Sequence, residues 1–147
     1  MKKPLLISAC LLGAPCKYSG GSNVLDADTL SALRERYRLV PVCPEVAGGL
    51  SVPREPSERT GERVVSRSGR DVTEAYRRGA AVALALCKRF SCDAALLKER
   101  SPSCGSGRIY DGSFNGTLVN GDGVAAALLQ NSGVRVVGES GTDELLK

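Results

Sequence analysis

The stretch that most constrains the fold is Leu39–Cys43, a short apolar run followed directly by a proline and a carboxylate. Its length and composition are typical of a strand. Pro44 cannot extend a strand ladder, so we expect the strand to stop there and to leave Cys43 and Glu45 in the loop beyond its carboxyl end. Pro41 is awkward in a central strand and indicates either an edge position or an irregular start of the strand. The run therefore places the thiol of Cys43 close to the carboxylate of Glu45, which can accept or donate a proton.

Two other strand-like runs end in a similar way. Leu5–Ala9 leads into Cys10, and Ala94–Leu97 leads into Lys98 and then into a Ser/Pro/Gly turn that contains Cys104. Sites in open parallel sheets form outside the carboxyl ends of the strands. If the three strands are parallel neighbours, their cysteines meet at one edge of the sheet.

Helix-like patterns alternate with the strands. They cover about 26–37, 73–89 and 123–131, and a last strand is predicted over 134–137 with Glu139 just beyond it. Alternating strands and helices indicate an α/β fold with right-handed crossovers. We predict a three-layer sandwich around a mainly parallel, Rossmann-like sheet of about four strands, within a single domain over residues 1–147.

The predicted helix starts depend on acidic residues. Asp26 is a plausible N-cap for the first helix, and Asp71 with Glu74 resembles a capping box for the second. Five residues of the second helix share one face. They are Tyr76, Ala80, Ala83, Cys87 and Phe90.

The remaining segments are rich in turn residues. Residues 44–62 form a long loop-rich connection, which is more often functional than a simple linker. Arg63–Ser66 and Arg70–Val72 around Gly69 predict a small hairpin. A second hairpin is expected between Arg108–Tyr110 and Thr117–Val119.

Composition restricts the chemistry. The chain has no histidine, so metal binding must depend on thiolates or carboxylates, and proton transfer on Glu, Asp, Lys, Tyr or Cys. Six cysteines and no recognisable signal peptide indicate a reducing cytoplasm, where cysteines are metal-binding or catalytic before they are disulfides. No stretch is long enough to span a membrane. The net charge of +4 suits an anionic small molecule or RNA, and equally an ordinary solvated surface.

The cysteine spacing favours a site built from separate loops. No Cys-x-x-Cys pair occurs, which disfavours thioredoxin-like and zinc-ribbon sites. Cys87 on a helix and Cys92 before a strand should be core or surface thiols. Three thiolates on a four-iron cubane would leave one iron open to substrate. Cys16 can close a four-thiolate site instead, or stay free as a sulfur carrier, and ligand counting leaves both possibilities open.

Several blocks of the sequence resemble a small bacterial family, once known only as a domain of unknown function, whose characterised members are thiouracil desulfidases. The resemblance covers nearly the whole chain. Its blocks are Ser8–Gly13, Cys16–Gly20, Cys43–Leu50 with Pro53–Arg54, Leu97–Lys98 with Ser101–Gly105, and Ile109–Gly112. Lys17 and Ser19 stand where Arg and Asp are common in relatives.

The resemblance implies an oxygen-sensitive 4Fe–4S cluster held by Cys10, Cys43 and Cys104, so aerobically purified protein can lack it. It also implies a non-redox reaction in which water attacks the thiocarbonyl carbon of a thiolated pyrimidine, such as 2- or 4-thiouracil, and sulfide is released. The physical chemistry agrees, because a thiocarbonyl sulfur is soft and suits iron with thiolate and sulfide ligands.

In the same resemblance a glutamate and a serine position the water. The glutamate corresponds to Glu45. The serine lies in the Ser101–Gly105 block, where we favour Ser101 over Ser103. In the absence of histidine, Glu45 is the expected base. The simpler readings are that Glu45 caps backbone N–H groups and that the serines form turns.

Further substrate-binding candidates surround these residues. They are Cys16, Lys17, Tyr18, Arg54 and Lys98. Tyr18 is expected to stack on a flat base or to pack its loop. Arg54 and Lys98 are expected to offset cluster and substrate charge, to bind a phosphate, or to be surface ion-pair residues.

The leading hypothesis is a cluster-dependent desulfidase acting on a small thiolated base or related thioamide. A free base, a nucleoside and a thiolated tRNA all remain open as substrates, and the sequence does not indicate an oligomeric state. One alternative is a non-catalytic module with structural zinc on Cys10, Cys16, Cys43 and Cys104. The other is a cluster-free sulfurtransferase that uses a cysteine persulfide.

Overall fold

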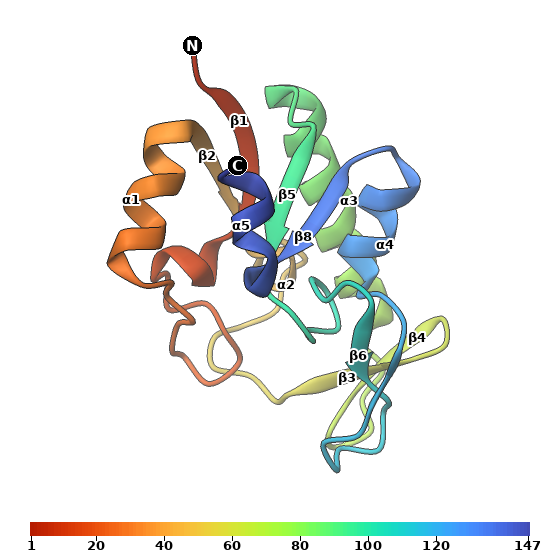
Figure 1. Cartoon of the computed structure of the whole chain (residues 1–147). Helices are drawn as coiled ribbons and strands as arrows, with labels where there is room; N and C mark the ends of the chain where they lie inside the picture. Colours follow the sequence, from red (N-terminus) through yellow and green to blue (C-terminus); the bar gives the residue numbers. More distant parts are fainter.

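The computed structural model describes residues 1–147 and has a four-stranded parallel sheet at its centre (Figure 1). The strand order is β2-β1-β5-β8, and every pairing within it is parallel. The strands are β1 (Lys3–Ser8), β2 (Tyr37–Val42), β5 (Ala94–Leu97) and β8 (Arg135–Gly138). The predicted α/β class and the four-stranded parallel sheet are confirmed.

Pro41 lies in an edge strand, as its chemistry predicts. Strand β2 pairs only with β1, where Pro41 is in register with Ile7. A proline, which lacks the N–H that a ladder needs, is tolerated at a sheet edge.

Helices cover both faces of the sheet, which gives the three predicted layers. On one face lie η1 (Ala9–Leu12), α1 (Ala27–Arg36) and α5 (Thr142–Leu145). On the other face lie α3 (Thr73–Phe90) and α4 (Val124–Asn131).

Alternation along β1 explains how one strand serves both cores. Leu5 and Ile7 are fully buried against the face covered by α1 and α5, whereas Leu6 is fully buried against α3 and α4. Successive strand side chains point to opposite faces, so an all-apolar strand must be covered on both sides.

The helix starts are partly as predicted. Asp26 caps α1 by accepting a hydrogen bond from the Thr29 N–H at 3.0 Å. Asp71 accepts from both the N–H and the hydroxyl of Thr73, at 2.9 and 2.6 Å. The capping box is wrong, because Val72 is the N-cap residue and Glu74 pairs with Arg77 on the helix surface instead.

The Asp71 contacts predict a pH-dependent contribution to stability. Hydrogen bonds from the hydroxyl and N–H of Thr73, and then the Arg63 guanidinium, lower the pKa of Asp71 from 3.8 to about 2. The charged form is therefore favoured by folding, and its contribution is present above the ordinary pKa and lost as pH falls toward 2. Asp71→Asn should unfold at a lower temperature than wild type at pH 7, with the difference shrinking between about pH 4 and pH 2.

Thermal unfolding followed by circular dichroism across that range would test this expectation. Glu62→Gln is a suitable control, since it removes an exposed carboxylate for which the structure gives no hydrogen bond. An Asp71→Asn protein whose deficit is the same at pH 2 and pH 7 would contradict the assignment.

Two hairpins extend from the sheet. Strand β3 (Ser57–Thr60) pairs with β4 (Arg63–Ser66), and β6 (Arg108–Tyr110) pairs with β7 (Leu118–Asn120). The second hairpin is confirmed within a residue. For the first hairpin, the predicted partner of Arg63–Ser66 is wrong. The segment Arg70–Val72 contributes only one isolated bridge, between Val65 and Asp71.

Phe90 shares its helix face with buried residues but is itself exposed. It is the last residue of α3, and Ser91 in the left-handed conformation ends the helix there. Figure 1 shows both hairpins beyond the carboxyl ends of the parallel strands, and β3 contacts β6.

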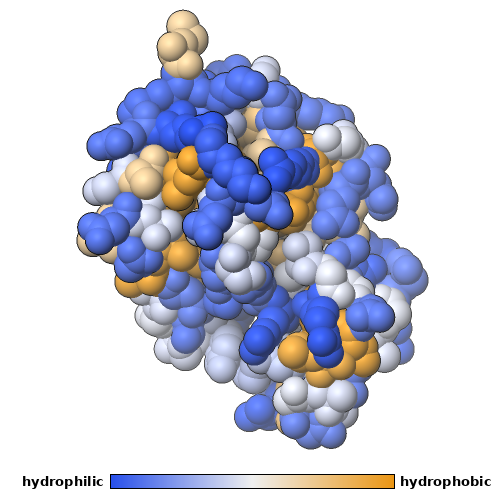
Figure 2. Space-filling model, in the orientation of Figure 1, coloured by the Kyte–Doolittle hydropathy of each residue, from blue (hydrophilic) through white to orange (hydrophobic).

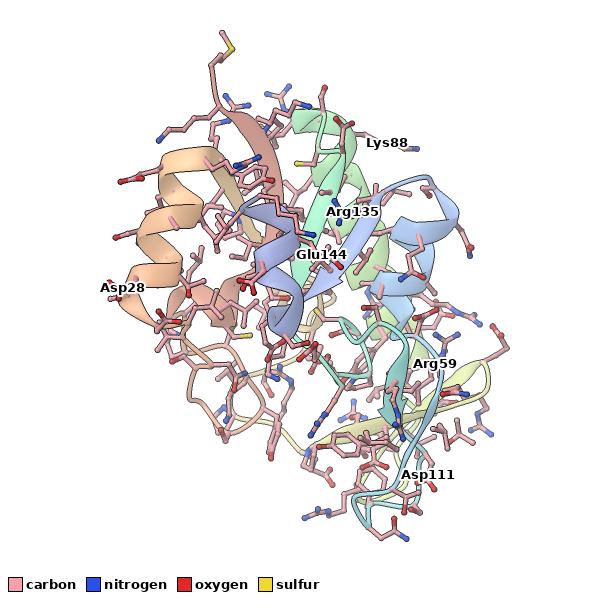
Figure 3. The ribbon with its side chains drawn as sticks, in the orientation of Figure 1. Asp28, Arg59, Lys88, Asp111, Arg135 and Glu144 are labelled. Carbon is pink, nitrogen blue, oxygen red and sulfur yellow. The ribbon has the colours of Figure 1, made fainter.

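The surface is mostly polar. The visible face is largely hydrophilic with small separate apolar patches (Figure 2). Arg135 on β8 and Glu144 on α5 point toward one another (Figure 3) and form an ion pair at 2.9 Å. Both side chains are more than half exposed, so the pair contributes at most about 1 kcal/mol. None of the helices combines the length and the apolarity that crossing a membrane requires.

Candidate functional site

A cavity of about 480 Å³ opens where the parallel strands end and the hairpins begin. Its walls come from the loops after β1, β2 and β5 and from both hairpins. All eleven site residues predicted from the sequence line it. They are Cys10, Cys16, Lys17, Tyr18, Cys43, Glu45, Arg54, Lys98, Ser101, Ser103 and Cys104.

Three thiols reach the cavity from three separate segments. Cys10 lies in η1 after β1, Cys43 directly follows β2, and Cys104 lies in the turn after β5. This placement follows from the parallel sheet, since neighbouring parallel strands end at the same edge. Cys87 and Cys92 are instead buried in the core under α3, away from the cavity.

Burial favours the protonated form of two of these thiols, Cys104 and Cys10. Burial raises the pKa of Cys104 to about 12, although the hydroxyls of Ser8 and Ser103 oppose the shift. Burial also raises the pKa of Cys10, while its contact with Asn23 lowers it. Thiolate binding to a metal would therefore release protons.

The spacing of the cavity thiols can be compared with the spacing that a zinc ion and an iron–sulfur cluster require. No three His, Cys, Asp or Glu side chains lie close enough together to hold one metal ion. A tetrahedral zinc site requires such a tight set, whereas the cysteines of a cubane bind different irons and stand further apart. The all-sulfur donor set around one cavity fits an iron–sulfur cluster.

Cys16 is the fourth thiol of the cavity. It is half-buried, and burial followed by the neighbouring Cys43 raises its pKa to about 12. Its carbonyl oxygen accepts a weak hydrogen bond from the Cys43 thiol, with a sulfur–oxygen distance of 3.8 Å. The loop that carries Cys16 is thus anchored beside Cys43.

Glu45 lies on a helix rather than in the expected loop. The short helix α2 (Pro44–Ala47) starts immediately after Cys43, which is its N-cap residue. Pro44 favours this start, because the first helical position needs no N–H and proline already has a helical φ. Glu45 is in the first turn of α2, and its side chain is 14% exposed.

Helix α2 is positioned by close contact with α3. Neither Gly48 nor Gly79 leaves room for a side chain. A Cβ at Gly79 would lie 1.7 Å from the carbonyl oxygen of Pro44, and one at Gly48 would lie 1.9 Å from that of Ala75. These glycines allow the two backbones to approach and fix where Cys43 and Glu45 stand.

The carboxylate of Glu45 is held at both oxygens. Arg54 donates from Nε and Nη2 to Oε1, at 3.1 and 3.0 Å. The hydroxyl of Ser103 donates to Oε2 at 2.9 Å. A carboxylate has about four acceptor positions, so Oε2 retains one for another donor.

The two serines form a short chain of hydroxyls. Ser101 Oγ accepts from the backbone N–H groups of Ser103 and Cys104, both at 3.1 Å, and lies 2.9 Å from Ser103 Oγ. Because Ser101 already accepts two hydrogen bonds, its own proton is directed to Ser103. Ser103, 2% exposed, is the serine in contact with Glu45, whereas the favoured Ser101 is one step removed.

The basic candidates differ in how they are used. The side chain of Lys98 forms an ion pair with Glu139 at 2.6 Å. The backbone N–H of Lys98 donates to Ser8 Oγ at 2.9 Å. Lys17 and the half-exposed Tyr18 line the cavity without any side-chain hydrogen bond.

Sequence reasoning missed two buried polar groups of the cavity wall. Ser8 is 2% exposed and stands out as the single hydroxyl at the end of an apolar strand, which was a usable signal. Tyr76 is 2% exposed and lines the cavity, whereas its sequence spacing indicates only a place on one helix face. Burial, and then the charge of Glu45, raise the pKa of Tyr76, so its phenol stays neutral beside that carboxylate.

Glu58 was missed as an organiser of the second hairpin. Its Oε1 accepts from the N–H groups of Gly112 and Phe114, at 2.9 and 3.1 Å. This fixes the β6–β7 turn against β3, and Phe114 contributes to the cavity wall.

Comparison with known proteins gives consistent likenesses over nearly the whole chain. The sequence model of a family described as 2-thiouracil desulfurase matches residues 5–141. The chain is 43% identical over 152 residues to "Uncharacterized protein YbbK" of Bacillus subtilis (strain 168), covering 97% of this chain and 99% of that protein. A solved structure named "[4Fe-4S]-dependent thiouracil desulfidase TudS" is 50% identical, with a TM-score of 0.94 over 98% of this chain and 95% of that one.

Proposed function

Because the chain belongs to the 2-thiouracil desulfurase family, we propose that it removes sulfur as sulfide from a thiouracil-like base without net redox change. The observation that carries the proposal is the convergence of Cys10, Cys43 and Cys104 on one cavity beside the Glu45–Ser103 pair. The resemblance of the structure to an iron–sulfur-dependent desulfidase supports the same chemistry.

Cys10, Cys43 and Cys104 would hold a 4Fe–4S cluster through one thiolate each. A cluster bound there supplies a soft Lewis acid that polarises the C=S bond of the substrate. Cys16 is left as a free thiol at the cavity wall.

Glu45 is the group that takes the proton from the attacking water. Its Oε2 keeps one acceptor position, and the contacts with Arg54 and Ser103 hold the carboxylate in one orientation. A base held in this way saves the free energy of orienting it during each turnover. Ser103 stabilises the carboxylate before reaction, and Ser101 holds Ser103.

Tyr76, whose phenol stays neutral, is a buried residue of the cavity lining beside Glu45. Lys17 and Tyr18, whose side chains line the cavity without hydrogen bonds to the protein, contact the substrate ring. We place the reaction in a reducing cytoplasm, where the thiols remain available for the cluster.

Anaerobic reconstitution followed by incubation with 2- and 4-thiouracil tests the proposal. Protein loaded with four irons should release one sulfide per uracil formed. Colourless protein with stoichiometric zinc would favour the structural module, and sulfide release without iron would favour the persulfide route.

Single cysteine substitutions separate these outcomes further. Cys10→Ala, Cys43→Ala and Cys104→Ala should each lose most bound iron and the visible absorption, and activity should fall to background. Cys87→Ala, a buried thiol outside the cavity, is the matched control and should keep both. A persulfide mechanism instead predicts that one substitution abolishes transfer while the other two are tolerated.

A further inference from the structure

Arg54 is the most fully engaged side chain of the cavity. Its side chain is 8% exposed. It donates twice to Glu45 Oε1, once to the carbonyl of Cys16 at 2.9 Å and once to the carbonyl of Ser51 at 3.0 Å. An arginine has five N–H donors, so these contacts leave only one for anything else.

This use of donors disfavours a role in gripping substrate. Only one N–H remains, so an anion that bound the guanidinium through two hydrogen bonds would have to displace Glu45 or one of the two backbone carbonyls. Losing such a partner leaves a largely buried polar group without its hydrogen bond, which is unfavourable. The geometry therefore differs from that of a substrate-binding arginine, which presents its open edge to the cavity.

The main chain of Arg54 holds the same loop as its side chain. The N–H of Arg54 donates to the carbonyl of Tyr18 at 2.8 Å, while Nη2 binds the carbonyl of Cys16. One residue thus connects the loop of residues 16–18 with the first turn of α2. No other residue bridges these two segments with charged donors.

We propose that Arg54 is a positioning residue, which fixes the base Glu45 and the Cys16–Tyr18 loop relative to each other. The catalytic part of this inference rests on the proposed function. It predicts that Arg54 affects the rate of the chemical step and not the affinity for substrate. The guanidinium is required, because the point charge of a lysine cannot serve Glu45, Cys16 and Ser51 together.

The test compares Arg54→Lys with Arg63→Lys. Arg63 provides a matched control, because its Nε and Nη2 converge on one oxygen of Asp71 at 3.1 and 2.9 Å, but on the exposed surface outside the cavity. In cluster-loaded protein, Arg54→Lys should lower kcat by about 10²-fold with KM changed less than about threefold. Arg63→Lys should leave both unchanged. A raised KM with normal kcat would overturn the proposal in favour of substrate binding.

A double-mutant cycle asks whether Arg54 acts through Glu45. In a Glu45→Gln background, adding Arg54→Lys should cause little further loss, since the base is already absent. Losses that multiply would show that Arg54 acts independently of Glu45 and would overturn the proposal.

The loop contact is tested without turnover. In metal-free, reduced protein, maleimide labelling of Cys16 followed by peptide mass spectrometry should be severalfold faster in Arg54→Lys than in wild type, and unchanged in Arg63→Lys. Equal labelling rates would overturn the loop part of the inference. Since this readout does not depend on desulfuration, it stays decisive even if loaded wild-type protein releases no sulfide. If Arg54→Lys does not fold, Arg54→Gln, which retains two donors, takes its place in each comparison.

Discussion

Glu45→Gln should lower kcat for sulfide release by about 10²–10⁴-fold, the range that general acid–base catalysis typically contributes. Glutamine keeps the shape of the side chain and can still accept a hydrogen bond from Ser103, but it cannot take a proton from water. Glu45 is not one of the proposed cluster ligands, so the iron content and the visible spectrum of the variant should match those of wild type. The measurement is anaerobic steady-state release of sulfide from thiouracil at equal cluster loading.

Glu55→Gln serves as the control for this substitution. Glu55 also accepts two hydrogen bonds, from the N–H and hydroxyl of Ser68, but it lies outside the cavity. Its replacement should leave kcat unchanged. Near-normal turnover in a fully loaded Glu45→Gln protein would remove Glu45 from the mechanism.

Gly79→Ala is expected to damage stability and activity together. Alanine in a helix interior is ordinarily favoured over glycine by about 0.5–1 kcal/mol, so propensity alone predicts a more stable protein. Here the added Cβ would lie 1.7 Å from the carbonyl oxygen of Pro44, and α2 must move. Overpacking of this kind typically costs about 1–3 kcal/mol. The displacement also shifts Cys43 and Glu45, so we expect weaker cluster retention and a loss of kcat of at least about 10²-fold.

Thermal unfolding and iron content measure the two effects of Gly79→Ala separately. Gly21→Ala is the comparison variant, because its Cβ would meet only ordinary contacts of 3.6 Å and longer. A Gly79→Ala protein as stable as wild type would show that α2 and α3 are not in contact at this glycine.

The sheet and the position of the three cysteines could be predicted because they follow from local signals. Apolar runs, the proline in β2 and the alternation of strands with helices are each visible in a few residues. Parallel strands then place Cys10, Cys43 and Cys104 at one edge without knowledge of any side-chain contact. Predicting that the three cysteines share one edge of the sheet therefore required only the order and direction of the strands.

The errors have a different physical origin. Strand β3, with the sequence Ser-Glu-Arg-Thr, carries no hydrophobic alternation, so its pairing with β4 depends on a neighbour that the local pattern does not indicate. Helix α2 has only four residues, too few to show helical periodicity, and Glu45 was therefore placed in a loop.

The hydrogen bonds of the site were the least predictable part. Ser103, and not Ser101, contacts Glu45, although Ser103 and Glu45 are 58 positions apart in the sequence. The contact therefore depends on how the turn that carries the serines lies against α2. Likewise, the sequence indicates only that Arg54 carries a positive charge. The fold shows that most of its N–H donors already form hydrogen bonds within the protein.

The three cavity thiols come from distant parts of the polypeptide, with Cys10 and Cys104 separated by 94 positions. An unfolded chain would almost never bring them together, since closing such long loops carries an entropic penalty. Whatever cofactor they share must therefore bind the native state far better than the denatured ensemble, and by mass action its occupancy raises the melting temperature. Loss of the cofactor and loss of the fold are in this way two coupled equilibria of one molecule.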